Sequence, residues 1–246
     1  MNILGIDCSS DSLCVAVRRS DSDASGDRYG TPKHPFRDTH GHEARDGTVV
    51  LEIDSGLRHA QRVLPATDLC LREAGITLNE LDLLTCASGP GSFTGLRIAM
   101  STIKGISSAL KVPFVAIPTL DCLAADWEDA CPIVLPVLNA HRGQFYAAIY
   151  ERGTRKSGYL DLPLVELLRL TDTFPEVLIV GPDADLLIES KENRPGLRVA
   201  RYSRRSAGRA LLDLALTRFR SEGPSLSDAS PLYVRKSDAE ENEKKG

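Results

Sequence analysis

The chain has 246 residues, enough for one or two domains with a sizeable hydrophobic core. Its hydrophobic content of 42% and charged content of 26% are typical of a soluble globular protein. The formal net charge of −4 argues against a protein that binds nucleic acid on its own, because such proteins carry a basic face. No apolar run approaches the length of a membrane span, and the first residues lack the basic region of a secretory signal. We therefore expect a cytoplasmic protein that has no membrane partner.

The cysteines indicate a reducing compartment. No two of them form a Cys-x-x-Cys pair, and most stand inside apolar runs. Such residues act as small buried hydrophobic side chains, and a disulfide framework is not expected in a chain of this length. The six are Cys8, Cys14, Cys70, Cys86, Cys122 and Cys131.

The first half of the chain predicts an α/β unit. We expect strands at 3–7, 13–18, 48–53 and 81–87, and helices at 57–75 and 94–110. Residues 20–47 are polar and predict a long mobile hairpin loop between the second and third strands. Its three histidines lack the fixed spacing of a metal site, so we expect no metal there; they are His34, His40 and His42.

A glycine-rich segment, residues 89–95, connects the strand at 81–87 to the helix at 94–110. Backbone N–H groups at such a turn often bind an anion. The spacing fits no standard phosphate loop, because Gly95 is followed by Leu96 rather than by a lysine. Thr94 also stands where a dinucleotide-binding loop has its third glycine. The segment is therefore similar to a ligand-binding loop without matching a known one.

The helix at 94–110 has few charged residues, only Arg97 and Lys104. A surface helix normally has one polar face, so this one needs cover on more than one side. Two interpretations remain open, a helix buried within its own domain and a helix at a protein interface. Its apolar stripe is Leu96, Ala99, Ile103, Ile106 and Leu110, and its small-residue face is Gly95, Thr102, Gly105 and Ala109.

The second half of the chain repeats the beginning of the first. Strands expected at 133–139 and 144–150 align with the first hairpin when the sequence is shifted by 132 positions, so that Asp7 aligns with Asn139. The equal register predicts a duplicated fold. Further along we expect strands at 177–180 and 197–200 and helices at 183–190 and 206–221. The predicted organisation is an N-terminal subdomain at 1–110, a C-terminal subdomain at 111–237 and a frayed tail at 238–246.

Two duplicated α/β subdomains with an acidic residue after the first strand resemble the actin–sugar kinase–Hsp70 fold. Within that fold the sequence closely resembles the TsaB (YeaZ) family of tRNA threonylcarbamoyladenosine biosynthesis proteins. The segments that carry this resemblance are 3–9, 59–65, 89–97, 118–121, 135–150 and 231–235. The glycine-rich segment is the specific one, and the others mainly supply order and spacing.

The resemblance implies a role in adding threonylcarbamoyl to the adenosine next to the tRNA anticodon. It implies a non-catalytic subunit that pairs with and activates a TsaD-type transferase, with a TsaE-type ATPase subunit in the same set. ATP would be bound by the partner subunits, so we expect no cofactor in this chain, and tRNA would be met through the complex. Without its partner the chain could form a homodimer.

In that fold ATP lies between the two halves, and the residues here indicate a vestigial nucleotide cleft. Active members have glycine in the hairpin turns, where this chain has mostly larger residues. An amide stands where the family usually has an aspartate, and an amide holds Mg²⁺ less well than a carboxylate. We expect no catalytic residue and no metal ligand, since His59 has Val63 four positions on and no His-x-x-x-His occurs. The cleft residues are Asp7, Ser9, Gly91, Asn139 and Gly181.

The two helices of the first half are the predicted partner-binding surface, because a charge-poor helix with a small-residue face can pack closely on another helix. Two other classes of protein were weighed against this one. An ATP-dependent small-molecule kinase of the same fold would use Asp7 and Gly91 as anchors, and a metalloprotease would need paired histidines, which are absent. The predicted partner-binding residues are Leu64, Leu71, Leu96, Ala99, Ile103, Gly105 and Ile106.

Overall fold

The computed structural model describes residues 1–20, 47–56, 58–187, 195–200 and 204–235 as two lobes, each built on one β-sheet. The first sheet contains β1 (Ile3–Asp7), β2 (Ser12–Arg19), β3 (Gly47–Asp54), β4 (Leu83–Gly89) and β5 (Phe114–Pro118). The second contains β6 (Ile133–Asn139), β7 (Gln144–Ala147), β8 (Tyr150–Glu151), β9 (Thr154–Arg155), β10 (Leu160–Pro163), β11 (Val177–Val180) and β12 (Leu197–Val199). The α-helices are α1 (His59–Ala74), α2 (Phe93–Leu110), α3 (Thr119–Ala125), α4 (Leu164–Thr171) and α5 (Arg204–Glu222), and the 3₁₀ helices are η2 (Leu78–Glu80) and η3 (Ala184–Leu187).

The two sheets have the same topology, which confirms the predicted duplicated actin-like fold. Their strand orders are β3-β2-β1-β4-β5 and β10-β7-β6-β11-β12, so each central strand is the first of its lobe. In both sheets this strand pairs antiparallel with the next strand in sequence, β2 or β7, and parallel with β4 or β11 on its other side. At one edge, β3 or β10 is antiparallel to β2 or β7, and at the other edge β5 or β12 is parallel to β4 or β11; the second sheet also has the short strands β8 and β9.

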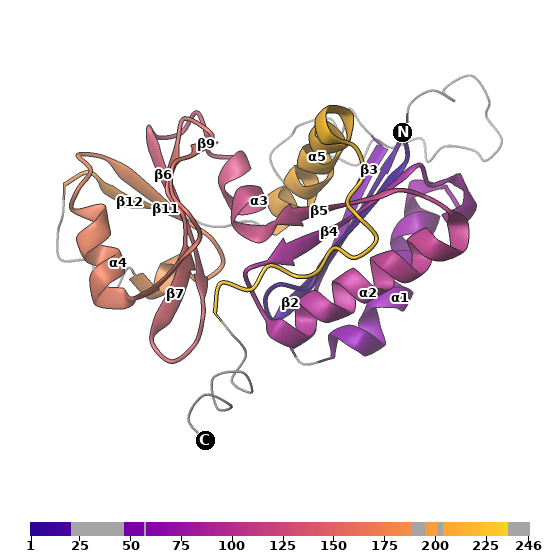
Figure 1. The fold of residues 1–246 in the computed structure, drawn as a ribbon, viewed down its shortest axis with the longest axis horizontal. Coiled ribbons are helices and arrows are strands. Elements are labelled where there is room, and N and C mark those ends of the chain that lie inside the picture. The colour runs from indigo at the N-terminus through magenta and orange to yellow at the C-terminus, as the bar shows by residue number, and fades with distance from the viewer. Residues whose placement is uncertain (21–46, 57, 188–194, 201–203, 236–246) are drawn as a thin grey trace.

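The helices and sheets form layers, with α3 and α5 between the two sheets (Figure 1). Alternate residues of β1 show how the first sheet is covered: Leu4 and Ile6 pack in one cluster with α1 and α2, whereas Ile3 packs with Leu212 of α5 in another. The second sheet has one face against α3 and the other against α4 and η3. Each sheet is therefore buried on both faces, which explains its nearly continuous apolar strands.

The boundary between the subdomains differs from the predicted one at 110/111. β5 lies beyond that point in sequence, yet it pairs in parallel with β4 and forms the edge of the first sheet. After β4 and α2, the chain must cross back to the sheet to form a parallel neighbour of β4. The apolar run between Pro113 and Pro118 is too short to have predicted this strand from the sequence. The last helix, α5, also packs on the first sheet, so the second lobe is not a continuous segment that runs to the end of the chain.

Several other predicted elements are corrected. The strand predicted at 144–150 is interrupted after Ala147, and its remainder forms the short hairpin β8–β9. The helix predicted at 183–190 is a 3₁₀ helix at Ala184–Leu187 within the described residues. Sequence reasoning missed α3, α4 and β10, which are all short. Other predicted parts lie outside the described residues. They are nearly all of the loop at 20–47, the single residue Leu57, and the tail at 238–246.

All six cysteines are free and buried, as predicted. Burial raises the pKa of the Cys70 thiol to about 11 and that of the Cys86 thiol to about 12. These thiols are therefore poor nucleophiles at neutral pH and serve as small apolar side chains. Across the described part of the chain, no helix is long and apolar enough to cross a membrane.

The glycine-rich segment packs against other backbone of the same chain. A Cβ atom on Gly91 would lie within 3.0 Å of the carbonyl oxygen of Ser9, and one on Gly95 would lie as close to that of Cys8. Ser9 also accepts a hydrogen bond from the backbone N–H of Ser92 at 2.7 Å. Glycine is needed at both positions because the β1–β2 turn occupies the space that a side chain would fill.

This packing predicts opposite effects for two substitutions in α2. Gly95→Ala should lower the free energy of unfolding by ~2–3 kcal/mol, because the added methyl group overlaps the Cys8 carbonyl. Gly105→Ala should raise it by ~0.5–1 kcal/mol, because a Cβ there meets nothing within 4 Å and alanine favours a helix. Urea unfolding of the two variants measures both changes. Equal stability of the two would contradict the close packing.

Candidate functional site

Two equivalent hairpin turns border the space between the lobes. In the first, the Asp7 carboxylate accepts a hydrogen bond from the backbone N–H of Ser9 at 2.7 Å. In the second, the Asn139 side-chain oxygen accepts one from the backbone N–H of His141 at 2.8 Å. Each side chain thus caps its own turn two residues on, at positions 132 apart in the sequence. The duplication predicted from the register therefore extends to individual hydrogen bonds.

The space between these turns is small. A cavity of about 10 Å³ lies there, and a volume of this order holds about one water molecule. Binding sites for small molecules usually enclose roughly 300–1,000 Å³. This cavity is far smaller than such a site. The lining residues are Asp7, Ser9, Ser10, Ser12, Cys14, Thr119, Leu123, Leu138, Pro182 and Ala207.

The structure brings the predicted cleft residues around this space, with different roles. Asp7 and Ser9 line it directly. Gly91 acts on this space indirectly, because it packs on Ser9. Asn139 is bound through its backbone N–H to the Asp183 carboxylate at 2.8 Å, which ties the second turn to the segment after β11. Gly181 has a φ of 126° and packs on the backbone of β6, where any side chain would collide with it.

The histidine at the start of α1 is part of the fold. His59 is buried, and its Nδ1 atom lies 2.8 Å from the hydroxyl of Ser55. Within the part of the chain that the structure describes, no three His, Cys, Asp or Glu side chains are arranged to hold a metal ion. The three histidines of the predicted loop lie outside those residues.

The outer surface of α1 and α2 differs in part from the predicted partner-binding surface. Leu64 is 60% exposed, Gly105 is exposed and Ile106 is half-buried. The other four predicted residues belong to the core, so the prediction is wrong for them. They are Leu71, Leu96, Ala99 and Ile103, with exposed fractions of 4% or less.

The reason for this error is that a helix covering a sheet uses its most apolar stripe for that purpose. In α2 the stripe that includes Ala99 and Ile103 packs against the first sheet in a cluster with Leu4 and Ile6. The interpretation of α2 as a helix buried in its own domain is therefore correct for this stripe. A charged residue in place of Ala99 would disrupt the core, so this substitution could not test partner binding.

Sequence reasoning missed part of the exposed surface. Leu69 of α1 is 40% exposed and lies one turn from the exposed Pro65, which directly follows Leu64. On α2 the exposed positions near Gly105 are small, namely Ser101, Ser108 and Ala109. The sequence signal that could have indicated this surface is the set of apolar residues of α1 that lie outside its buried stripe. We call the surface formed by Leu64, Pro65, Leu69, Ser101, Gly105, Ser108 and Ala109 the α1–α2 face.

A second exposed feature lies at the start of α2, where aromatic rings gather around a cation. The Arg97 guanidinium lies 3.9 Å from the centre of the Phe93 ring, and its Nε donates a hydrogen bond to the Tyr233 hydroxyl at 3.0 Å. The two rings are 5.1 Å apart. Phe93 is 38% and Tyr233 40% exposed, so the cluster is at the surface. It joins residues 136 positions apart and could not be found from local patterns.

A polar cluster also lies in the second lobe, on the side of α3. The Asp121 carboxylate accepts hydrogen bonds from the hydroxyls of Tyr150 and Tyr159. Arg155 stacks on the Tyr159 ring at 4.4 Å and lies 3.7 Å from Asp121. Burial, together with the nearby carboxylate, raises the pKa of both tyrosines, so they stay protonated and donate to Asp121. The cluster fixes β8, β9 and the start of β10 to α3.

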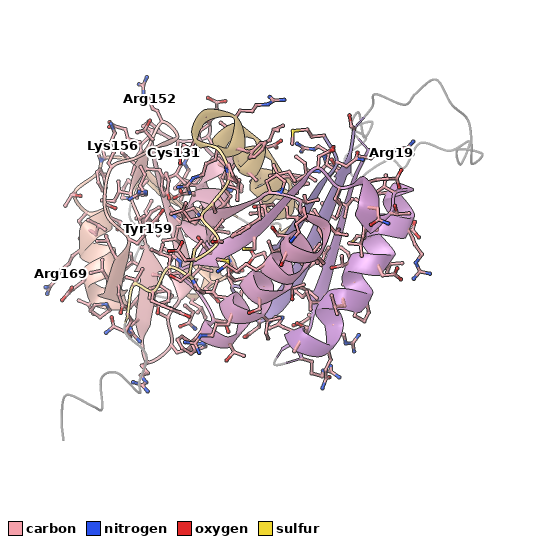
Figure 2. The ribbon with its side chains drawn as sticks, turned by 45° about the vertical axis from the view of Figure 1, so that its right-hand side comes forward. Arg19, Cys131, Arg152, Lys156, Tyr159 and Arg169 are labelled. Atoms are coloured by element: carbon pink, nitrogen blue, oxygen red, sulfur yellow. The ribbon has the colours of Figure 1, made fainter. Side chains whose placement is uncertain are left out.

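Four basic side chains of the described residues lie in different parts of the molecule. Figure 2 shows Arg152, Lys156 and Arg169 at the periphery of the second lobe and Arg19 at the far end of the first. Lys156 is paired with Glu151 at 3.5 Å. These cations do not form one patch of the kind that binds a nucleic-acid backbone.

Comparison with known proteins agrees with this geometry. Residues 44–159 match the family model of TsaD, described as tRNA N6-adenosine threonylcarbamoyltransferase. The "tRNA threonylcarbamoyladenosine biosynthesis protein TsaB" of Bacillus subtilis is 27% identical over 213 residues, covering 80% of this chain and 89% of that protein. The TsaB protein of Escherichia coli is 34% identical over 110 residues, but the match spans only 48% of its length.

Among solved structures, YeaZ from Pseudomonas aeruginosa has the same fold. It aligns with a TM-score of 0.66 and 22% identity, covering 95% of this chain and 99% of that one. The structural match accounts for both lobes, and the sequence matches include the glycine-rich segment and the α1–α2 face. The chain is therefore similar to the TsaB (YeaZ) proteins, in sequence over most of its length and in fold over both lobes.

Proposed function

We propose that this chain is a non-catalytic subunit in the biosynthesis of tRNA threonylcarbamoyladenosine, where it pairs with and activates a TsaD-type transferase subunit. The observation that carries the proposal is the double sequence match. The chain is similar to TsaB proteins over most of its length and to the transferase family itself over residues 44–159. A subunit that shares the fold of its partner can pack against it through equivalent helices, as two copies do in a symmetric dimer.

The interlobe cleft supports a non-catalytic role. Asp7 and Asn139 use their side-chain oxygens to cap their own turns, and the cavity between the turns has about the volume of one water molecule. The amide of Asn139 is also a weaker Mg²⁺ ligand than a carboxylate. We assign ATP binding and group transfer to the partner subunits, with a TsaE-type ATPase as the third member. The tRNA would be met through the complex.

The α1–α2 face is the surface that we assign to the transferase subunit. Leu64 and Leu69 supply exposed apolar area on α1, whereas α2 has small residues around Gly105 that allow close approach of another helix. Buried apolar side chains against small residues are the usual content of a helix–helix interface. Without the transferase subunit, the same face would form a homodimer.

Substitutions on the α1–α2 face should weaken binding without unfolding the chain. Gly105→Arg puts a bulky cation into the proposed interface and Leu64→Asp puts a carboxylate there, so each should lower affinity for the transferase subunit by about 100-fold or more, since an unpaired charge is buried. Gly105→Ala is the matched control and should bind within about threefold of the wild type. Calorimetric titration of the purified subunits measures affinity, and mass spectrometry of the tRNA nucleosides measures modification.

Circular dichroism should give the same fold for all three variants, because a Cβ at Gly105 has open space around it. Wild-type affinity for both charged variants would contradict the assignment of this face.

A second substitution tests whether the cleft takes part in chemistry. Asp7→Asn keeps an oxygen that can accept the Ser9 N–H bond and removes the negative charge. The complex reconstituted from this variant, the transferase subunit and the ATPase subunit should then form modified tRNA at a rate within about twofold of the wild type. In this proposal the carboxylate contacts no reacting group. The initial rate of threonylcarbamoyl transfer is the measurement.

The alternative function, an ATP-dependent small-molecule kinase, gives a different outcome. A kinase would need Asp7 to hold the metal ion of ATP, and the purified chain alone would turn over ATP. Loss of activity in Asp7→Asn with an unchanged melting temperature would favour that alternative.

A further inference from the structure

The segment after α5 runs back over the first lobe and ends at the second. Figure 1 shows it leaving α5, crossing the front of the first lobe and reaching the junction between the lobes. Residues 223–235, which we call the C-terminal strap, begin at Gly223 and are fixed first to the edge strand β5. Ser225 donates its N–H to the Phe114 carbonyl at 2.8 Å, and its hydroxyl accepts the Ala116 N–H at 3.0 Å.

The strap is next fixed beside the glycine-rich segment. The Leu232 N–H donates to the Ser88 carbonyl at 2.6 Å, at the end of β4. The Leu232 carbonyl lies so close to Gly89 that any side chain there would collide with it. One residue further on, Tyr233 packs on Phe93 and accepts the hydrogen bond from Arg97. These contacts attach the strap to the first lobe at the start of α2.

The last described residue of the strap, Arg235, binds the second lobe. Its Nε and Nη2 donate to the two carboxylate oxygens of Asp161 in β10, each at 2.7 Å. Its Nη1 donates to the Ala140 carbonyl at 3.3 Å. The two side chains of the pair are only 21% and 20% exposed. Two parallel bonds between a guanidinium and a carboxylate are stronger and more directional than a surface ion pair, and a lysine cannot form them.

Two attachments of the strap, at Leu232 and at Arg235, lie beside the two turns that border the cleft. Ala140 follows Asn139 in the second turn, and the glycine-rich segment beside Leu232 packs on Ser9 in the first. The strap therefore bridges the lobes next to the small cavity at Asp7. Apart from it, the chain passes between the lobes through α3 and through the connection from β12 to α5.

We propose that the C-terminal strap is a latch that holds the two lobes in the closed arrangement, with Arg235 as its attachment to the second lobe. Release of Arg235 from Asp161 lets the lobes separate and widens the cleft between the two turns. Arg235 is a positioning residue, because it acts on the cleft through the Ala140 turn and touches no reacting group. The inference does not depend on the proposed function, since it concerns the arrangement of the lobes in the isolated chain.

The distance between the lobes tests the latch directly. Spin labels can be attached to cysteines introduced by Gln61→Cys on α1 and Val165→Cys on α4, both exposed positions. The native thiols are buried, so they should not compete for the label. Pulsed electron paramagnetic resonance of the full chain then gives the distribution of distances between the two labels.

Arg235→Gln and Asp161→Asn should each shift this distribution to longer distances by several ångströms and broaden it, and the double variant should shift it no further than either single one. Arg235→Lys should give a partial shift, because it keeps the charge but loses the two parallel bonds. The control is Arg18→Gln, which removes the Arg18–Asp213 pair of the same length between β2 and α5. Since both of these elements pack in the first lobe, its distances should match the wild type.

Unchanged distances in Arg235→Gln and Asp161→Asn would overturn the latch, as would an equal shift in Arg18→Gln. If Arg235→Gln does not fold, Asp161→Asn decides, because its amide leaves the β10 backbone and one acceptor oxygen in place. Near-ultraviolet circular dichroism of each labelled variant establishes that the lobes themselves are intact.

Discussion

The close approach of Gly91 and Gly95 to the turn at Cys8 and Ser9 is the contact on which the rest of the structure depends. A backbone carbonyl occupies the place of each absent side chain, so α2 begins directly against the first hairpin. This contact fixes the direction of α2, and with it the exposed side of Gly105. The same segment receives the strap at Gly89, so it joins the turn, the helix and the C-terminal residues in one packed unit.

In a nucleotide-binding member of this fold, a glycine-rich turn leaves room for phosphate beside its N–H groups. In this chain, groups of the protein itself bind to the turns. Ser9 accepts the Ser92 N–H, and Asp7 and Asn139 cap the two turns that would face a ligand. In our proposal, these hydrogen bonds within the chain take the place of those that a ligand would make. This is the physical content of the vestigial cleft in our proposal.

The α1–α2 layer illustrates how burial divides one helix between two tasks. The stripe containing Ala99 and Ile103 stabilises the first lobe, because it covers the parallel strands β1 and β4. The opposite side has small exposed residues at Ser101, Gly105 and Ser108, beyond Arg97 at the start of the helix. The low charge of α2 therefore has two sources, a stripe in the core and a small-residue side that we assign to a partner in our proposal.

The sequence by itself determined the duplicated α/β fold, the buried cysteines and the central strands. These properties depend on local apolar patterns and on a repeat in equal register, so they can be read along the chain. The prediction of Asp7 and Asn139 as cleft residues uses the same patterns, because each ends the first strand of its half.

Only the tertiary structure decided which side chains of α1 and α2 are exposed, since the same local pattern suits an apolar residue that faces a sheet and one that faces a partner. It also decided that β5 and α5 complete the first lobe, because long-range pairing and packing outweigh chain order. The bonds from Tyr233 to Arg97 and from Arg235 to Asp161 join residues 136 and 74 positions apart. Such contacts arise when the folded lobes bring distant segments together, and no local pattern in the sequence specifies them.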